Sequence, residues 1–412
     1  MQDFRSINRE HFYNYFLQGC KLPTLNTMLG LELEHFIIDT NTKESISYYG
    51  EQGVEAVLKA ISTKFEKQIL SQGHLIGLAN SEYTITLEPA AQLEISISPQ
   101  DSIADIERIY ESFLAILCPE LNKRGYLLAR CGYQPKSKAK ELKLIPKSRY
   151  EFMNSYFETV GEYGAYMMRG TASTQVSIDY CSEADYSDKY RIAYYLTPFF
   201  TFLSDNSPIF EGKKNEHRMN RITIWDSVDK KRVDISPYLK NGTLDFSDYI
   251  DFLYHAPVIV KKVGDEEEYT DLTIGELALG KEFTAEEVEH YLSMVFPAVR
   301  LKKYIEIRMA DSMPIFSVKA YLAIIKGIFA NISSSTILVD KLAQQTENSV
   351  QLITRELMKS GIEARFGTVT AKEILKQMFD IAYDGVSDNE KSLLLSVKQN
   401  ILEKGTILGD RK

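Results

Sequence analysis

The chain has 412 residues and a formal net charge of -9 at pH 7, and 44% of its residues are hydrophobic and 25% charged. This is the composition of a globular protein, and it argues against a disordered chain. The acidic balance and the absence of a Lys/Arg-rich block argue against a nucleic-acid-binding protein. The four cysteines form no CxxC pair, so the sequence indicates neither a zinc site nor a disulfide framework, and we expect a reducing compartment.

The amino-terminal segment lacks the apolar core of a signal peptide. No segment approaches the ~20 apolar residues that are needed to cross a bilayer. We therefore expect a soluble, cytoplasmic protein that acts on small molecules, with no nucleic-acid or membrane partner, and that is a monomer or a homodimer.

The first predicted strand, residues 29–36, alternates Leu31 and Leu33 with Glu32 and Glu34. This alternation is typical of a half-buried strand and directs both carboxylates to one face. Two like charges ~7 Å apart on one face repel each other, unless a cation lies between them. The two glutamates are therefore candidate metal ligands, and a solvated sheet face is the alternative.

The second acidic segment, residues 84–98, repeats this pattern. Glu88 precedes a turn that contains proline, and after the turn Glu94 alternates with apolar residues on the opposite face. The segment therefore adds two carboxylates to the candidate site.

Two later strands, residues 171–180 and 304–311, carry the same signature. Gln175 lies on the polar face of the first, and Glu306 and Arg308 share the polar face of the second. Four such strands predict one antiparallel sheet with an apolar back and an acidic front. Hard divalent cations take oxygen ligands and hold phosphate-bearing substrates. We therefore predict a metal-lined catalytic face, and a wet structural face is the alternative.

Arginines and histidines complete the candidate residues. Arg308 would enter the acidic site, where a fixed cation neutralises a phosphoryl group or binds a carboxylate. Arg149 and Arg221 offer the two-point grip that carboxylates and phosphates prefer, with surface ion pairs as the alternative. His35 falls on the opposite strand face from the acidic pair, so we expect a core role. Motifs of serine hydrolases, P-loops and dinucleotide-binding folds are absent from the sequence.

Helical periodicity and capping signals predict the helical parts of the chain: residues 53–66 and 101–116, and helices that begin at Thr284 and Thr370. Neither a low-complexity linker nor an internal repeat is found, so we expect an α+β fold. The expected organisation is one catalytic domain over residues 1–412, with a sheet core at about 25–315 and a helical C-terminal layer at about 316–412.

Eight strings follow one another along the sequence: LGLELEHFIID, ITLEPAAQLEIS, IPKSRYEFM, MMRGTASTQVSIDY, NSPIFEG, RITIWDSVD, FSDYIDFLYHAPVIV and FPAVRLKKYIEIRMAD. In content and order they are similar to the plant-type glutamate–cysteine ligases, and the chain resembles that family from about residue 25 to 315. The resemblance implies the fold of the catalytic half of glutamine synthetase, a curved antiparallel sheet that forms a funnel, flanked by helices.

The resemblance also implies an activity. This is the ATP- and Mg²⁺-dependent ligation of the γ-carboxylate of glutamate to the amine of cysteine through a γ-glutamyl phosphate, the first step of glutathione synthesis. The alternatives are the same chemistry with another amine, or a catalytically inactive binding relative. By motif, the implied roles are metal ligation for Glu32, Glu34, Glu88, Glu94 and Glu306, catalysis for Arg308, Glu34 and Glu306, ATP contact for Gln175, and substrate binding for Met167, Met168, Thr171, Arg149 and Arg221.

The chain departs from the family pattern at Ala90, Ala91 and Met309, which stand where the family usually has glycine. Added side chains at these positions would crowd the substrate, so we expect acceptors no larger than cysteine. We also expect that replacing any one of Glu32, Glu34, Glu94 and Glu306 abolishes turnover and leaves the fold intact or stabilised, because like-charge repulsion is relieved.

Overall fold

The computed structural model describes residues 3–23, 28–240, 242–264 and 266–408 of the chain. The predicted start of the sheet core at about residue 25 lies outside these residues. Within them, a large antiparallel sheet is built from β1 (Leu29–Asp39), β2 (Lys67–Ser71), β3 (His74–Ala79), β4 (Tyr83–Leu87), β5 (Leu93–Gln100), β6 (Tyr126–Ala129), β7 (Ser173–Ile178), β12 (Val299–Leu301) and β13 (Ile305–Asp311). The strand order is β12-β13-β7-β1-β5-β4-β3-β2, and β6 also pairs with β1.

The four predicted acidic strands are immediate neighbours at the centre of this sheet, in the order β13-β7-β1-β5. Glu34 stands directly opposite Glu94, and Glu32 stands opposite Gln175. The apolar residues between them are buried, as the alternation predicts. The α+β fold and the antiparallel sheet are therefore confirmed. The turn expected after Glu88 divides the segment 84–98 into β4 and β5.

The turn between β4 and β5 shows why the position of Ala91 suits glycine. Ala91 donates its backbone N–H to the carbonyl of Glu88 at 2.9 Å, and Glu88 donates to the carbonyl of Gln92 at 2.9 Å. This closed turn holds Ala91 at φ +66°, in the left-handed region that glycine adopts without strain.

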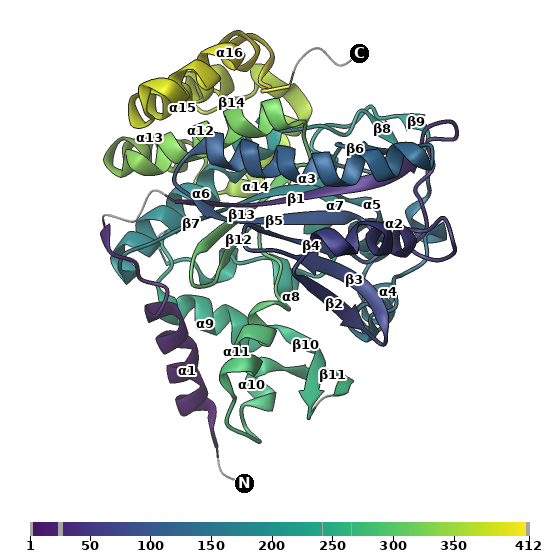
Figure 1. Ribbon diagram of the computed structural model, residues 1–412. Coiled ribbons are helices and arrows are strands. Elements are labelled where there is room, and N and C mark those ends of the chain that lie inside the picture. The colour runs from purple at the N-terminus through teal and green to yellow at the C-terminus, as the bar shows by residue number, and fades with distance from the viewer. Residues whose placement is uncertain (1–2, 24–27, 241, 265, 409–412) are drawn as a thin grey trace.

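Helices cover both sides of the sheet (Figure 1). In the view of Figure 1, α3 and the C-terminal helices lie above the sheet, and α9, α10, α11 and the hairpin of β10 and β11 lie below it. The bounds are α1 (Arg5–Leu17), α2 (Val54–Ile61), α3 (Ile103–Lys123), α4 (Ser148–Val160), α5 (Gly164–Gly170), α6 (Glu183–Leu203), α7 (Asn220–Asp226), α8 (Lys230–Val233), α9 (Phe246–His255), α10 (Ile274–Leu277), α11 (Ala285–Leu292), α12 (Ile315–Ala330), α13 (Ile332–Gln345), α14 (Val350–Ser360), α15 (Ala371–Gly385), α16 (Asp388–Lys404), β10 (Pro257–Val263) and β11 (Glu266–Thr273). Short hairpins are formed by β8 (Ile209–Phe210) with β9 (Lys213–Lys214), and by β14 (Arg365–Phe366) with β15 (Val369–Thr370).

The capping signals in the sequence fall at helix starts. Thr284 and Thr370 are N-caps of α11 and α15, each with a complete capping box. Ser102 caps α3 through the backbone N–H of Ala104. Among the described residues, no single helix is long and apolar enough to cross a bilayer, and only α12 and α13 taken together, across a 95° bend, meet both criteria.

His35 has the core role that the sequence predicts. Its ring is buried, lies 2.8 Å from the hydroxyl of Tyr110 and 3.2 Å from the carbonyl of Leu93, and stacks on the Tyr110 ring. Burial, reinforced by Arg130, lowers the pKa of His35 to about 3, so the ring is neutral at physiological pH.

Candidate active site

A cavity of about 250 Å³ lies against the polar face of the central strands. Its walls come from the sheet, from α4, α5 and α7, and from the segment that precedes β12. Of the residues predicted for the site, the cavity brings together Glu32, Glu34, Glu88, Glu94, Gln175, Arg149, Arg308, Met167, Met168 and Thr171. Glu306 and Arg221 are buried close by and do not line it.

The carboxylates of this wall repel one another. Burial, with the charge of Glu34, raises the pKa of Glu88 to about 7. Burial, with the charge of Glu32, raises the pKa of Glu94 well above its usual range. The pKa of Glu32 is also raised, by burial and then by the charge of Glu306. Such shifts mark a site that favours either protons or a bound cation.

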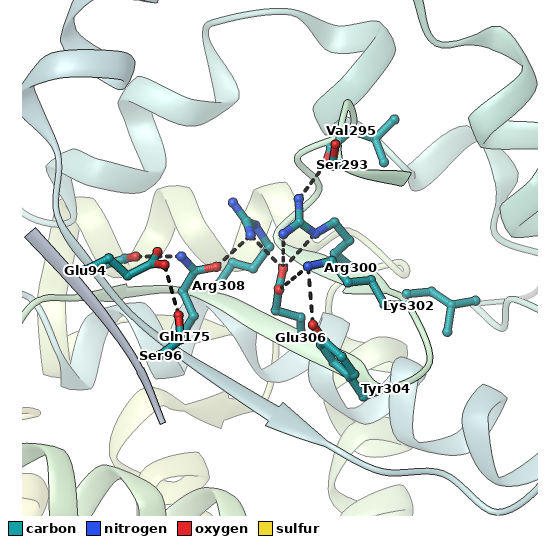
Figure 2. A network of polar contacts seen from close by, with 12 residues as sticks. Glu94, Ser96, Gln175, Ser293, Val295, Arg300, Lys302, Tyr304, Glu306 and Arg308 are labelled. Atoms are coloured by element: carbon teal, nitrogen blue, oxygen red, sulfur yellow. Dashed lines mark hydrogen bonds and ion pairs between the residues drawn. The ribbon is translucent and has the colours of Figure 1, made fainter. Parts of the chain in front are cut away.

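Gln175 connects the acidic wall to an arginine (Figure 2). Its carbonyl oxygen accepts from Arg308 at 2.6 Å, as Figure 2 shows. Its amide N–H donates to Glu34 at 3.0 Å. Glu34 also accepts the backbone N–H of Ser173 at 2.7 Å. These bonds fix the Glu34 carboxylate and keep it from pairing directly with Arg308.

Glu306 lies at the centre of a cationic cluster (Figure 2). Arg300 donates to it from Nε at 2.7 Å, Lys302 at 3.1 Å and Arg308 at 2.6 Å. Burial alone would raise the pKa of Glu306, but these three cations outweigh burial and hold the pKa well below its usual range. Arg300 and Arg308 also line the cavity, so the cluster gives the cavity a cationic side.

This cluster corrects one expectation. Glu306 repels Glu32, but its direct partners are three cations, so its removal would lose more attraction than the repulsion it relieves. The reason given for a stabilised fold, relief of repulsion, is therefore wrong for Glu306, and the effect of the change on the fold stays a prediction. A metal ion would have to compete with these cations for its carboxylate, and its role as a metal ligand stays a prediction.

Two more cations come from the PKSRY segment at the start of α4. Arg149 donates to the carbonyl of Ser293 at 2.9 Å, and Lys147 lies 4.7 Å from the ring centre of Tyr150. Burial lowers the pKa of both Arg149 and Lys147. Both side chains line the cavity, although the sequence assigned a substrate role to Arg149 alone.

Arg221 supports the site from outside the cavity. It donates to the backbone carbonyl of Arg308 at 2.8 Å, and its guanidinium lies 5.5 Å from the ring centre of Trp225. The structure therefore does not bring Arg221 to the substrate cavity, in contrast to the role that the resemblance implies. Its contacts hold β13 against α7.

An apolar wall faces the charged ones. Met167 and Met168, to which the resemblance assigns substrate binding, lie on α5 and line the cavity. Met153, Trp225 and Phe296 also line it, and sequence reasoning missed them. Met153 belongs to the buried stripe of α4, a signal that any packed helix gives. The positions of the other two depend on tertiary packing and left no local pattern.

The crowding argument from the glycine replacements is wrong in its premise. Ala90, Ala91 and Met309 are buried but do not line the cavity. Met309 lies where a bulge shifts the register between β13 and β7. Any limit on the size of the acceptor must therefore come from the residues that line the cavity.

Comparison with known proteins assigns the family. The model of glutamate–cysteine ligase family 2 matches residues 28–406. The chain belongs to this family. The chloroplastic glutamate–cysteine ligase of Medicago truncatula is 28% identical over 418 residues, which cover 98% of this chain and 81% of the relative. The Arabidopsis thaliana chloroplastic enzyme is 28% identical over 389 residues, covering 92% and 74% of the two chains.

A solved structure of glutamate–cysteine ligase from Francisella tularensis in complex with AMP superposes with a TM-score of 0.52. Its sequence is 13% identical to this chain, and the match covers 91% of this chain and 82% of that one. This likeness supports the fold. The expected cytoplasmic location is wrong by these comparisons, because the plant relatives of this family member are chloroplastic proteins.

The donor set of the acidic wall fits a hard divalent cation in its chemistry. All its candidate ligands are glutamate oxygens, and burial together with mutual repulsion raises the pKa of Glu32, Glu88 and Glu94 in spite of the nearby cations. In the described part of the chain, no three His, Cys, Asp or Glu side chains converge closely enough to hold one ion. Magnesium binding by this family member is therefore a proposal.

Proposed function

We propose that this protein is an ATP-dependent glutamate–cysteine ligase that works through a γ-glutamyl phosphate. The observation that carries the proposal is a single cavity, in a member of this family, with glutamates on one wall and the guanidinium groups of Arg149, Arg300 and Arg308 on another. We also propose that residues 1–412 act as one catalytic unit.

The first step activates glutamate. An oxygen of its γ-carboxylate attacks the γ-phosphorus of ATP, the bond to the bridging oxygen breaks, and ADP leaves. Arg308 and Arg300, held in place by Glu306, would stabilise the charge that develops on the transferring phosphoryl group. Because both guanidinium groups are fixed before the reaction, little reorganisation is needed.

The acidic wall would hold magnesium. Glu32, Glu34, Glu88 and Glu94 are the proposed ligands, with Gln175 as the neighbour that contacts ATP. Bound magnesium would supply positive charge to the triphosphate. Glu34 is oriented for this role by Gln175 and by the backbone of β7.

The second step forms the amide. The neutral amine of the acceptor attacks the acyl carbon, the bond from carbon to the phosphate oxygen breaks, and inorganic phosphate leaves with the proton that the amine nitrogen loses. Met167, Met168 and Thr171 would border the amino-acid substrates. The hydroxyl of Thr171 donates to the carbonyl of Met167 at 2.9 Å, so the Thr171 side chain is held in place by the chain itself.

The proposal is tested by product formation. The purified protein is incubated with ATP, magnesium, glutamate and, in turn, cysteine, 2-aminobutyrate, alanine or ammonia, and ADP and ligated product are measured. Glu34→Gln should lose turnover, and Glu44→Gln, an exposed glutamate in a surface turn, is the matched control. ADP with another amine but not with cysteine would favour the alternative acceptor. No ADP with any amine would favour an inactive binding relative.

A further inference from the structure

Three side-chain N–H groups among the residues that line the cavity are buried and have no hydrogen-bond partner among the described residues. They are Nε of Arg149, Nε of Arg308 and Nε1 of Trp225. Buried donors in native proteins nearly always have a partner, so each exception needs an explanation. When several such donors gather around one cavity, a ligand that supplies acceptor oxygens explains them together.

Trp225 is the donor to which neither the sequence nor the family resemblance gives a role. It lies on α7, is only 9% exposed, and lines the cavity. The guanidinium groups of Arg221 and Arg308 lie 5.5 and 5.7 Å from the centre of its ring. Two cations beside one indole make its surroundings positive, so an anionic oxygen is the favoured acceptor for its N–H group.

The neighbours of Trp225 indicate which anion this is. Met153, Met167 and Phe296 form the apolar part of the same cavity. The triphosphate is suited to the acidic wall, where cations would be held between the glutamates and the phosphates. Trp225 lies beside the apolar part of the cavity, so it suits a ligand that has a small anionic group next to aliphatic carbons. An amino acid with its α-carboxylate is such a ligand.

We propose that Trp225 is a substrate-binding residue whose indole N–H donates a hydrogen bond to the α-carboxylate of an amino-acid substrate, next to Arg308 and Arg149. The identity of the substrates rests on the proposed function. The carboxylate belongs either to the glutamate that is activated or to the cysteine that accepts the acyl group.

The test replaces Trp225 by phenylalanine, which keeps an aromatic ring beside the two arginines and removes the N–H group. Calorimetry measures the binding of glutamate and of cysteine to the wild-type and Trp225→Phe proteins. It also measures two analogues without the α-carboxylate, 4-aminobutyrate for glutamate and cysteamine for cysteine. We expect at least one amino acid to bind about 10-fold more weakly to the variant, as for a lost hydrogen bond to a charged group. Its analogue should bind equally to both proteins, and the amino acid that responds identifies the source of the carboxylate.

A matched control is Tyr186→Phe. Tyr186 is fully buried, its hydroxyl has no partner among the described residues, and it does not line the cavity. This variant should bind both amino acids as the wild-type protein does. MgATP binding should be unchanged in both variants.

The wild-type protein gives a second readout that needs no variant. Trp225 is the single tryptophan of the chain, so all of the tryptophan fluorescence comes from this position. Titration with the bound amino acid should change the emission in a saturable way, and the decarboxylated analogue should change it less. If Trp225→Phe does not fold, this comparison decides the question.

Unchanged amino-acid affinities in Trp225→Phe would overturn the inference. Equal weakening of an amino acid and its decarboxylated analogue, a loss confined to MgATP, or no amino-acid binding to the wild-type protein would do the same. The proposed function fails separately. A protein that binds an amino acid through Trp225 but releases no ADP contradicts only the ligase, and an active ligase with an unaffected variant contradicts only the role of Trp225.

Discussion

Glu306 and Glu94 are both buried glutamates on the polar face of the central sheet, but the structure predicts opposite effects when each is replaced by glutamine. Glu306 is fully buried, with Arg300, Lys302 and Arg308 as charged partners. Its loss would leave three cations without the carboxylate that they contact directly. Removing one member of a buried ion pair costs ~3–5 kcal/mol. Glutamine keeps the shape and still accepts a hydrogen bond, so we expect a loss near ~3 kcal/mol of unfolding free energy.

Glu94 is the matched control. Burial and the charge of Glu32 raise its pKa, which favours the protonated, neutral form. Glutamine resembles that form and still accepts the hydroxyl of Thr86, which donates to Glu94 at 2.8 Å. The change Glu94→Gln should therefore leave the unfolding free energy within ~1 kcal/mol of the wild-type value, or raise it because repulsion between carboxylates is relieved.

Urea unfolding without magnesium measures both variants, followed by the fluorescence of Trp225 and by far-ultraviolet circular dichroism. The transition midpoint of Glu306→Gln should fall at an unchanged slope. The folded pKa of Glu306 is depressed, so its stabilisation is present above the unfolded pKa of ~4.3 and is lost as pH falls through the folded pKa. The difference from wild type should therefore be constant from about pH 6 to 8. Equal midpoints for the two variants, or a stabilised Glu306→Gln protein, would refute this reasoning.

Four further predictions follow from the cavity and the turn beside it. Arg308→Lys should lower kcat more than it raises KM, because lysine lacks the planar fork, and wild-type kinetics would make Arg308 a peripheral ion-pair partner. The folded pKa of Glu88 is raised to about 7, so without magnesium stability should fall as pH rises from ~4.5 to ~7, with a weaker dependence in Glu88→Gln measured by urea midpoints. Ala91 has φ +66°, so Ala91→Gly should stay within ~1 kcal/mol of wild type and Ala91→Val should lose ~2 kcal/mol or more by the same assay. Among cysteine, 2-aminobutyrate and alanine, the differences in kcat/KM should correspond to only ~1–3 kcal/mol of activation free energy, and a preference for phenylalanine would contradict a cavity of about 250 Å³.

The central sheet was predictable because its signal is local. Each acidic strand alternates with period two, and this period assigns side chains to faces without knowledge of the partner strand. The family resemblance then implied a curved antiparallel sheet, but the order of the strands comes from the structure. The pairing of Glu34 with Glu94 follows from a register that the alternation cannot give, because a shift by two residues leaves every face unchanged.

The cationic cluster was predictable in part. Arg300 and Glu306 stand opposite each other in the hairpin of β12 and β13. Their separation in the sequence, with a short turn between, is a hairpin signal that would have placed them together. Sequence reasoning placed Arg308 beside Glu306 but still grouped Glu306 with the acids, and therefore expected repulsion where the structure has attraction.

The helical wall was not predictable from local patterns. The cavity takes Met153, Trp225 and Phe296 from three separate segments, and the sequence around each is typical of a residue packed in a hydrophobic core. For Arg221 the error was the reverse, because a residue assigned to substrate binding lies outside the cavity. Its residue type suggested substrate binding, but the fold directs it to the backbone of Arg308.

The neutral amide of Gln175 explains how one cavity keeps both an acidic and a cationic side. If Glu34 and Arg308 paired directly, each charge would neutralise the other, and neither would be available for a cation or a phosphoryl group. Gln175 satisfies both with one side chain, since it donates to Glu34 and accepts from Arg308. Glu306 restrains Arg308 from the far side in the same way. The separation of charge is therefore built into the sheet before any substrate enters, which is the preorganisation that electrostatic catalysis requires.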